Sequence, residues 1–103
     1  ASRALSDEIR HAKIAFALAY AAGSDKYAVG PIRIDASVRT KEQFAIDNYR
    51  DAVINEAQSA IQLQKEANQL VQDGKPALAS IVNSIAVDEE RHAELGNSID
   101  AWI

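Results

Sequence analysis

The sequence predicts an all-α protein, a bundle of helices that forms a single domain over residues 1–103, and three observations support this. First, 103 residues suit one domain and not two. Second, apolar residues recur at helical spacing through three long stretches of the chain. Third, glycine and proline are few, and most of them separate these stretches from one another.

The composition narrows the classes of function. Hydrophobic residues make up 48% and charged residues 25% of the chain, which is typical of a globular protein. Without cysteine there is no disulfide, no thiolate metal site and no cysteine nucleophile. The net charge of −4 argues against a nucleic-acid surface, and the longest uncharged apolar stretch, residues 14–23, is too short to span a bilayer. We therefore expect no nucleic-acid partner, no membrane span and a cytoplasmic location.

The first helix is expected over residues 1–22. It is rich in alanine, and Gly23 is its stop signal. Its apolar pattern is already in phase at Ala1, where no capping residue precedes it, and the chain contains no methionine. We therefore expect the domain to be incomplete at its N-terminus, which leaves a removed targeting segment as an alternative to the cytoplasmic location.

Residues 24–39 form an irregular connection with Gly30-Pro31 at its centre and room for a brief strand over residues 32–34. The connection is long for a small helical domain. If the helices on either side run parallel, it must climb about 40 Å to bring their polar residues level, and an extended chain of this length reaches about 50 Å. The length therefore favours a long crossover between the first and second helices.

The second helix is expected over residues 40–73 and the third over residues 76–103. Thr40 with Gln43 matches a capping box, Gly74 ends the second helix, and Pro76 opens the third. Because the link between them is short, these two helices should be antiparallel neighbours.

Each helix carries an inward-facing stripe of residues spaced by alternating steps of three and four. Each stripe is apolar except near its middle, where acidic side chains or an acid with a histidine interrupt it. The stripe of the second helix is Ile46, Tyr49, Val53, Glu56, Ala60, Leu63, Ala67 and Leu70. That of the third is Leu78, Val82, Ile85, Glu89, His92, Gly96, Ile99 and Ile103, and that of the first is Ala1, Ala4, Glu8, His11, Ala15 and Leu18.

Two segments of the chain repeat each other. Residues 7–12 read DEIRHA and residues 88–93 read DEERHA, and each contains Glu-x-x-His. On a helix, residues three apart project from the same face, so each pair can bind one ion together. Two such pairs with a further glutamate form the site of di-metal carboxylate bundles. The candidate metal ligands are Glu8, His11, Glu56, Glu89 and His92.

The stripes select these acids from their neighbours: Glu89 shares the inner face with His92, whereas Asp88 and Glu90 do not. Taken alone, Glu56 is open to another interpretation, as the partner of an arginine, and a lone histidine on an apolar face is usually a packed core residue. Five such groups together in a core without metal would be costly, by several kcal/mol for each unpaired charge. The joint pattern therefore predicts a metal site.

Residues around the two motifs are candidates for a supporting role. Asp7 and Asp88 can accept the free N–H of a ligand histidine on the facing helix, and Arg10 and Arg91 can pair with these aspartates. The alternative is that all four are solvated surface charges. Tyr49 can donate a hydrogen bond or relay an electron, although a core aromatic is the ordinary interpretation. Tyr20, Tyr27 and Trp102 are interpreted as packing or interface residues.

The doubled motif, Asp7-Glu8-Ile9-Arg10-His11 and Asp88-Glu89-Glu90-Arg91-His92, resembles the ferritin-like di-iron carboxylate superfamily. The stretches DEIRHAKIAFALA, VGP and IAVDEERHAEL are also similar to bacterial ferritin-like domain proteins. The resemblance implies ligand-bearing helices in the order Glu, Glu-x-x-His, Glu, Glu-x-x-His. This sequence supplies the last three, so a missing N-terminal segment or a partner chain is expected to provide the first, and exposed apolar faces would favour a homo-oligomer.

The resemblance further implies two bound ions, Fe, Mn or one of each, that react with dioxygen or peroxide together with an unidentified small-molecule substrate or electron donor. Within this class an oxidase or oxygenase type of redox enzyme is expected. A ferroxidase that handles iron is the first alternative. A metal-free helical interaction module that keeps the motif is the second.

Overall fold

The structure is a computed structural model that describes residues 2–23, 30–31 and 37–103. These residues are helical or irregular, with no strand among them, which confirms the all-α prediction. The strand expected over residues 32–34 and the side chain of Tyr27 lie outside the described residues. The chain divides into two units, residues 1–38 and 39–103, which are described separately. The single domain and the crossover between the first two helices stay predictions.

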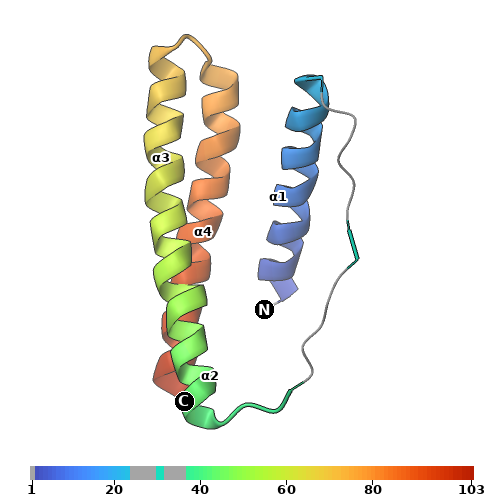
Figure 1. The fold of residues 1–103 in the computed structure, drawn as a ribbon. Helices are drawn as coiled ribbons and strands as arrows, with labels where there is room; N and C mark the ends of the chain where they lie inside the picture. The colour runs from blue at the N-terminus through green and yellow to red at the C-terminus, as the bar shows by residue number, and fades with distance from the viewer. Residues whose placement is uncertain (1, 24–29, 32–36) are drawn as a thin grey trace. The chain divides into compact units, whose positions relative to one another are not determined.

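Among the described residues of the first unit there is one helix, α1 (Ser2–Ala21), drawn in blue in Figure 1. It ends as the sequence predicts. The N–H of Gly23 donates to the carbonyl of Tyr20 at 3.0 Å, and Gly23 has a φ of +90°, a backbone angle that glycine adopts without steric cost.

The second unit is a long helical hairpin (Figure 1). Its first arm runs through α2 (Lys41–Asn48), a π-helix η1 (Tyr49–Asn55) and α3 (Glu56–Gln72), and its second arm is α4 (Pro76–Trp102). The two arms are antiparallel, as predicted. The π-helix was not expected from the sequence, which indicated one regular helix over residues 40–73.

A capping residue fixes the start of the first arm. The Oγ1 of Thr40 accepts a hydrogen bond from the N–H of Gln43 at 3.0 Å, which is one half of the expected capping box. The side chain of Gln43 instead donates to Asp47 Oδ1 at 2.9 Å.

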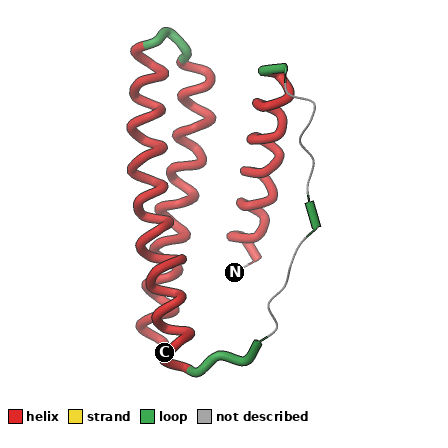
Figure 2. Tube along the Cα trace, in the orientation of Figure 1, coloured by secondary structure: helices red, strands yellow, loops and turns green. Residues whose placement is uncertain are grey.

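A Schellman motif forms the turn between the arms, shown as a short loop in Figure 2. The N–H of Gly74 donates to the carbonyl of Val71 at 3.1 Å, and that of Lys75 to the carbonyl of Leu70 at 2.8 Å. Gly74 has a φ of +75°, which explains why glycine ends this helix.

Alanine dominates the contact between α3 and α4. The buried hydrophobic residues of the described chain are all alanines, and they recur at intervals of seven: Ala60 and Ala67 on α3, and Ala79, Ala86 and Ala93 on α4. The larger residues of the predicted stripes, such as Leu63 and Val82, are only half-buried. Because the distance between packed helices depends on the side chains at their contact, alanines allow the two backbones to approach closely.

The predicted stripe is wrong at the start of the first arm. Ile46 and Tyr49 are 59% and 51% exposed, whereas Ala45, Asn48 and Ala52 are half-buried. The physical reason is η1: a π-helix bonds each residue to the fifth along and not the fourth, so it shifts the residues before it out of the phase of a regular α-helix. The stripe is therefore displaced by one residue at Ile46 and Tyr49, whereas Val53 is half-buried, as its place in the predicted stripe requires.

Large apolar side chains remain exposed on the helices of both units, among them Leu5, Ile61, Val71 and Trp102. Within the ranges that the structure describes, no helix combines the length and the apolar character needed to cross a bilayer.

We predict that Ala86→Leu lowers the free energy of unfolding by about 1–3 kcal/mol, because Ala86 is only 1% exposed and a larger side chain would force the two arms apart. Urea denaturation followed by circular dichroism measures the change. Ala77→Leu, at an exposed position of the same helix, is the matched control and should leave stability within about 0.5 kcal/mol of the parent. Equal stability of the two variants would show that the alanine contact is not tight.

Candidate metal centre

Three of the predicted ligands lie together in the second unit. Glu56 is the first residue of α3, and Glu89 and His92 lie at the middle of α4 on one face of that helix. The distance from His92 Nδ1 to Glu56 Oε2 is 3.9 Å, and that from His92 Nδ1 to Glu89 Oε2 is 4.0 Å. Each of the three residues offers a ligand atom within 4.8 Å of the others. The structure therefore brings together side chains that are more than thirty residues apart in the sequence.

These distances suit a shared ion better than direct contact. Both distances from His92 Nδ1 exceed the upper limit of an ordinary N–H···O hydrogen bond, which is about 3.2 Å. Two atoms that each lie about 2.1 Å from one ion can be at most about 4.2 Å apart. One cation between His92 and either carboxylate therefore fits the spacing that the structure shows.

The three side chains differ in their access to solvent. Glu89 and His92 are buried, while the side chain of Glu56 is 28% exposed. Acidic side chains are rarely buried unless they are paired or coordinate metals. Two carboxylates and an imidazole at one buried position are therefore a distinctive group, and their oxygen and nitrogen atoms are the ligands that Fe(II) and Mn(II) accept.

The π-helix ends where the site begins, because η1 closes at Asn55 and Glu56 follows it directly. π-Helical turns inside α-helices are often found at functional sites. The element that sequence reasoning missed therefore adjoins a residue that it selected.

Asp88 is buried, although the sequence favoured Glu89 alone for the inner face. Arg91 explains how this second acid is accommodated: its Nη2 donates to Asp88 Oδ1 at 2.9 Å, which is the pairing expected from the sequence. The pair occupies one turn of α4 beside Glu89 and His92. A hydrogen bond from a ligand histidine to Asp88 stays a prediction.

The repeat of this motif lies on α1, within the first unit. His11 Nδ1 lies 3.8 Å from Glu8 Oε1, close to the 4.0 Å between His92 and Glu89. Asp7 and Arg10 flank this pair as Asp88 and Arg91 flank the other. The two copies of Glu-x-x-His thus share their local geometry as well as their sequence.

The aromatic candidates lie at the surface. Tyr49, seven residues before Glu56, is half exposed and is not a core aromatic as the sequence suggested. Tyr20 and Trp102 are more exposed still, at 72% and 84%, so neither packs in a core of the structure described.

Sequence reasoning missed a polar contact between α2 and α4. Asn48 Nδ2 donates to the carbonyl of Gly96 at 2.9 Å and to Asp100 Oδ1 at 2.7 Å. Gly96 also lies so close to Ala52 that a Cβ there would be 2.9 Å from the Ala52 backbone. The signal available in the sequence was a glycine in the interior of a predicted helix, which often marks a close approach between backbones.

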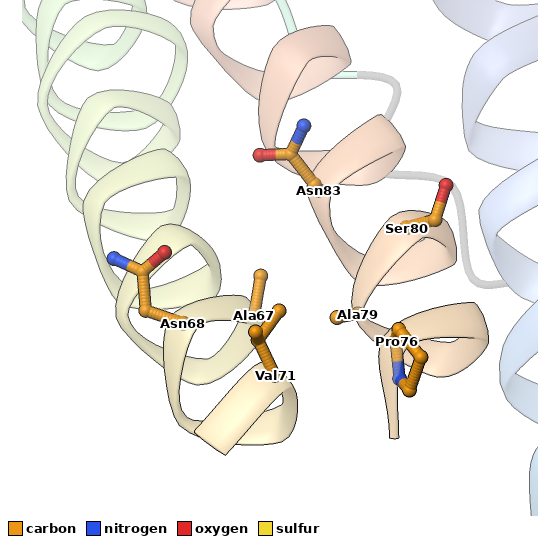
Figure 3. A pocket seen from close by; sticks show the side chains of 7 residues that line it. All are labelled: Ala67, Asn68, Val71, Pro76, Ala79, Ser80 and Asn83. Carbon is orange, nitrogen blue, oxygen red and sulfur yellow. The ribbon is translucent and has the colours of Figure 1, made fainter. Parts of the chain in front are cut away.

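Two hollows flank the alanine contact of the hairpin. The larger, of about 290 Å³, lies between α3 and α4 near the turn, with Asn68 and Asn83 at its sides (Figure 3). The smaller, of about 200 Å³, is lined by sequence neighbours of the candidate ligands, such as Ala57, Glu90 and Ala93. The larger hollow is far from the candidate ligands, because Ala79 and His92 are about 20 Å apart along α4. The residues that line the smaller one include none of the candidate ligands.

Comparison of the chain with protein-family models, with curated proteins and with solved structures found no match in any of the three.

We predict that Arg91→Leu lowers the free energy of unfolding by about 1–3 kcal/mol, because it removes a hydrogen-bonded partner of a buried carboxylate. Thermal or urea denaturation measures this change. Arg50→Leu is the control, since Arg50 donates to Asp51 at the surface, where it lowers the pKa of Asp51 through that hydrogen bond. A smaller loss is expected there because solvent replaces the contact. Equal losses would show that the Asp88 pair has no special role.

Proposed function

We propose that the chain is a non-haem di-metal carboxylate protein of the ferritin-like type, which reacts with dioxygen or peroxide as an oxidase or oxygenase. Its two ions are Fe, Mn or one of each. The proposed ligands are Glu8, His11, Glu56, Glu89 and His92.

The observation that carries the proposal is the group of Glu56, Glu89 and His92. It joins two carboxylates and an imidazole from two antiparallel helices at the distances given above. The donor set fits the proposed ions, because carboxylate oxygen and imidazole nitrogen are suited to Fe and Mn, while no cysteine is present to favour Zn or an iron–sulfur cluster.

The second ion is proposed from the repeated motif. Glu8 and His11 repeat the spacing and the local geometry of Glu89 and His92. Two facing Glu-x-x-His pairs with a further glutamate make up a di-metal site in helical bundles. How the two units come together is part of the proposal, and its support is the sequence repeat.

When bound, the ions would supply the electrons that dioxygen or peroxide accepts. The residues of the chain would bind the ions and orient the ligand side chains around them. Glu56 approaches from one arm, and Glu89 with His92 from the other. Arg91 donates a hydrogen bond to Asp88, the residue next to the proposed ligand Glu89.

The smaller hollow is lined by sequence neighbours of the proposed ligands and by none of the ligands themselves. Its volume of about 200 Å³ lies below the range of about 300–1,000 Å³ typical of pockets for drug-sized ligands. A diatomic oxidant fits such a space easily. A second candidate function is a ferroxidase, in which Fe(II) itself is the substrate, because both hollows described for the hairpin are smaller than typical pockets for organic ligands.

We predict that Glu89→Gln removes at least one metal ion from the protein, because the substitution keeps the volume of the side chain but removes its charge. The full chain is loaded with Fe(II) under anaerobic conditions, and bound metal is measured after desalting. Glu90→Gln, the same change at the exposed neighbouring residue, is the control and should keep the metal content of the parent. Parent protein that binds no Fe or Mn would contradict the proposal and favour the metal-free module.

We predict that the Fe(II)-loaded parent consumes dioxygen and that His92→Ala does not, as followed with an oxygen electrode. Sustained formation of ferric product from added Fe(II) alone would identify the ferroxidase. Consumption that continues only with a reductant or an organic substrate would identify the oxidase or oxygenase. An identical rate in parent and His92→Ala would refute both.

A further inference from the structure

We infer that η1 sets the register of the first arm against α4. Contacts of Asn48 and Ala52 with α4 hold η1 in place, and they position Glu56 opposite Glu89 and His92. Asn48 and Gly96 are then positioning residues of the proposed metal site. The part of this inference that concerns metal affinity rests on the proposed function, whereas the part that concerns the register of the helix does not.

A side chain holds the start of η1. The amide of Asn48, the last residue of α2, donates both to the backbone carbonyl of Gly96 and to the carboxylate of Asp100, at 2.9 and 2.7 Å. The bond to Asp100 is short because its acceptor is a carboxylate. Both bonds are partly buried, and together they fix where residue 48 lies along α4.

A backbone contact holds the middle of η1. A Cβ at position 96 would lie 2.9 Å from the carbonyl carbon and oxygen of Ala52, which is closer than side chains and backbone approach in proteins. Only glycine allows this approach. A glycine inside a helix costs about 1 kcal/mol relative to alanine, so its presence in the middle of α4 is explained by the contact that it permits.

The spacing of the contacting residues suits the π-helix. Asn48, Ala52 and Glu56 follow one another in steps of four, and all three contact or face α4. In a regular α-helix of 3.6 residues per turn, eight residues would rotate the last of them by about 80° away from the first. The wider π turn takes up this rotation. In the observed winding, residues 48, 52 and 56 therefore lie closer to one line facing α4 than they would in a regular α-helix.

The same sequence is also compatible with a second register of the first arm against α4. With regular α winding, the apolar stripe Ile46, Tyr49 and Val53 would face α4 in phase with Glu56. The observed register instead leaves Ile46 and Tyr49 more than half exposed, which is unfavourable for apolar groups. The contacts of Asn48 and Gly96 must offset this loss. Weakening them should therefore return the segment to the α register and rotate α2 by about one residue.

Thiol labelling tests the register directly, because the natural chain has no cysteine. Ala45→Cys and Ile46→Cys are made separately in the full chain. In the observed register Ala45 is half-buried and Ile46 is exposed, so the thiol at position 46 should react faster than that at position 45. Adding Gly96→Ala or Asn48→Asp should abolish or reverse this order. An unchanged order in both backgrounds would overturn the inference.

Metal affinity tests the positioning role. We expect Asn48→Asp and Gly96→Ala to bind Co²⁺, used as a spectroscopic probe, about 10- to 100-fold more weakly than the parent, a loss typical of removing a group that orients a ligand. Asn97→Asp, the same change at an exposed residue beside Gly96, is the matched control and should bind as the parent does. Thermal denaturation of each variant confirms that it is folded at the temperature of the titration.

A rescue separates positioning from general stability. The double variant Asn48→Asp with Asp100→Asn exchanges donor and acceptor and restores one hydrogen bond between the helices. It should recover both the labelling order and part of the affinity for Co²⁺. Folded Asn48→Asp and Gly96→Ala that bind Co²⁺ as tightly as the parent would overturn the positioning role. Parent protein that binds no Co²⁺ but shows the expected labelling order would refute the proposed function and the positioning role. It would still support the inference that η1 sets the register of the first arm.

Discussion

The approach of Gly96 to the backbone of Ala52 is the contact on which the rest of the hairpin depends. Because no side chain separates the two helices there, α4 and η1 approach more closely than any other residue at position 96 would allow. Asn48 secures that register on one side of the contact, and Glu56 meets His92 on the other. Because Gly96 has no Cβ, the π winding of η1 and the position of Glu56 in the candidate metal centre depend on the same contact with α4.

The small residues of the hairpin explain why polar groups lie at its centre. Where Ala60, Ala86 and Ala93 allow α3 and α4 to pack closely, few large apolar side chains fill the contact. Glu89 and His92 are buried on the same helix as Ala86 and Ala93, and His92 lies next to Glu56 of the other arm. Burial of such groups is unfavourable without a countercharge, and a bound cation would supply one. The same chemistry that makes the site capable of binding metal would therefore also stabilise the packing of the two arms.

Local sequence signals predicted the ends of the elements well. Thr40, Gly74 and Pro76 each act through hydrogen bonds or backbone angles of their own neighbourhood, and the structure places all three as expected. The pairing of Arg91 with Asp88 was predictable for the same reason, since residues three apart on a helix are neighbours. The inward stripe of the first arm was predicted correctly on α3, at Ala60 and Ala67, but not at Ile46 and Tyr49, because a π turn leaves no periodic signal in the apolar residues.

By itself, the sequence determined that the chain is helical, where the hairpin turns, and which acids and histidines share a helix face, because all of these follow from interactions within a few residues. The tertiary structure decided which face of the first arm meets α4. There the apolar residues Ile46 and Tyr49 compete with Asn48 and Ala52, and the choice depends on Gly96 and Asp100, which lie about fifty residues away in the sequence. The local sequence pattern does not predict the outcome of this competition, because the outcome depends on how closely the backbones of η1 and α4 can approach.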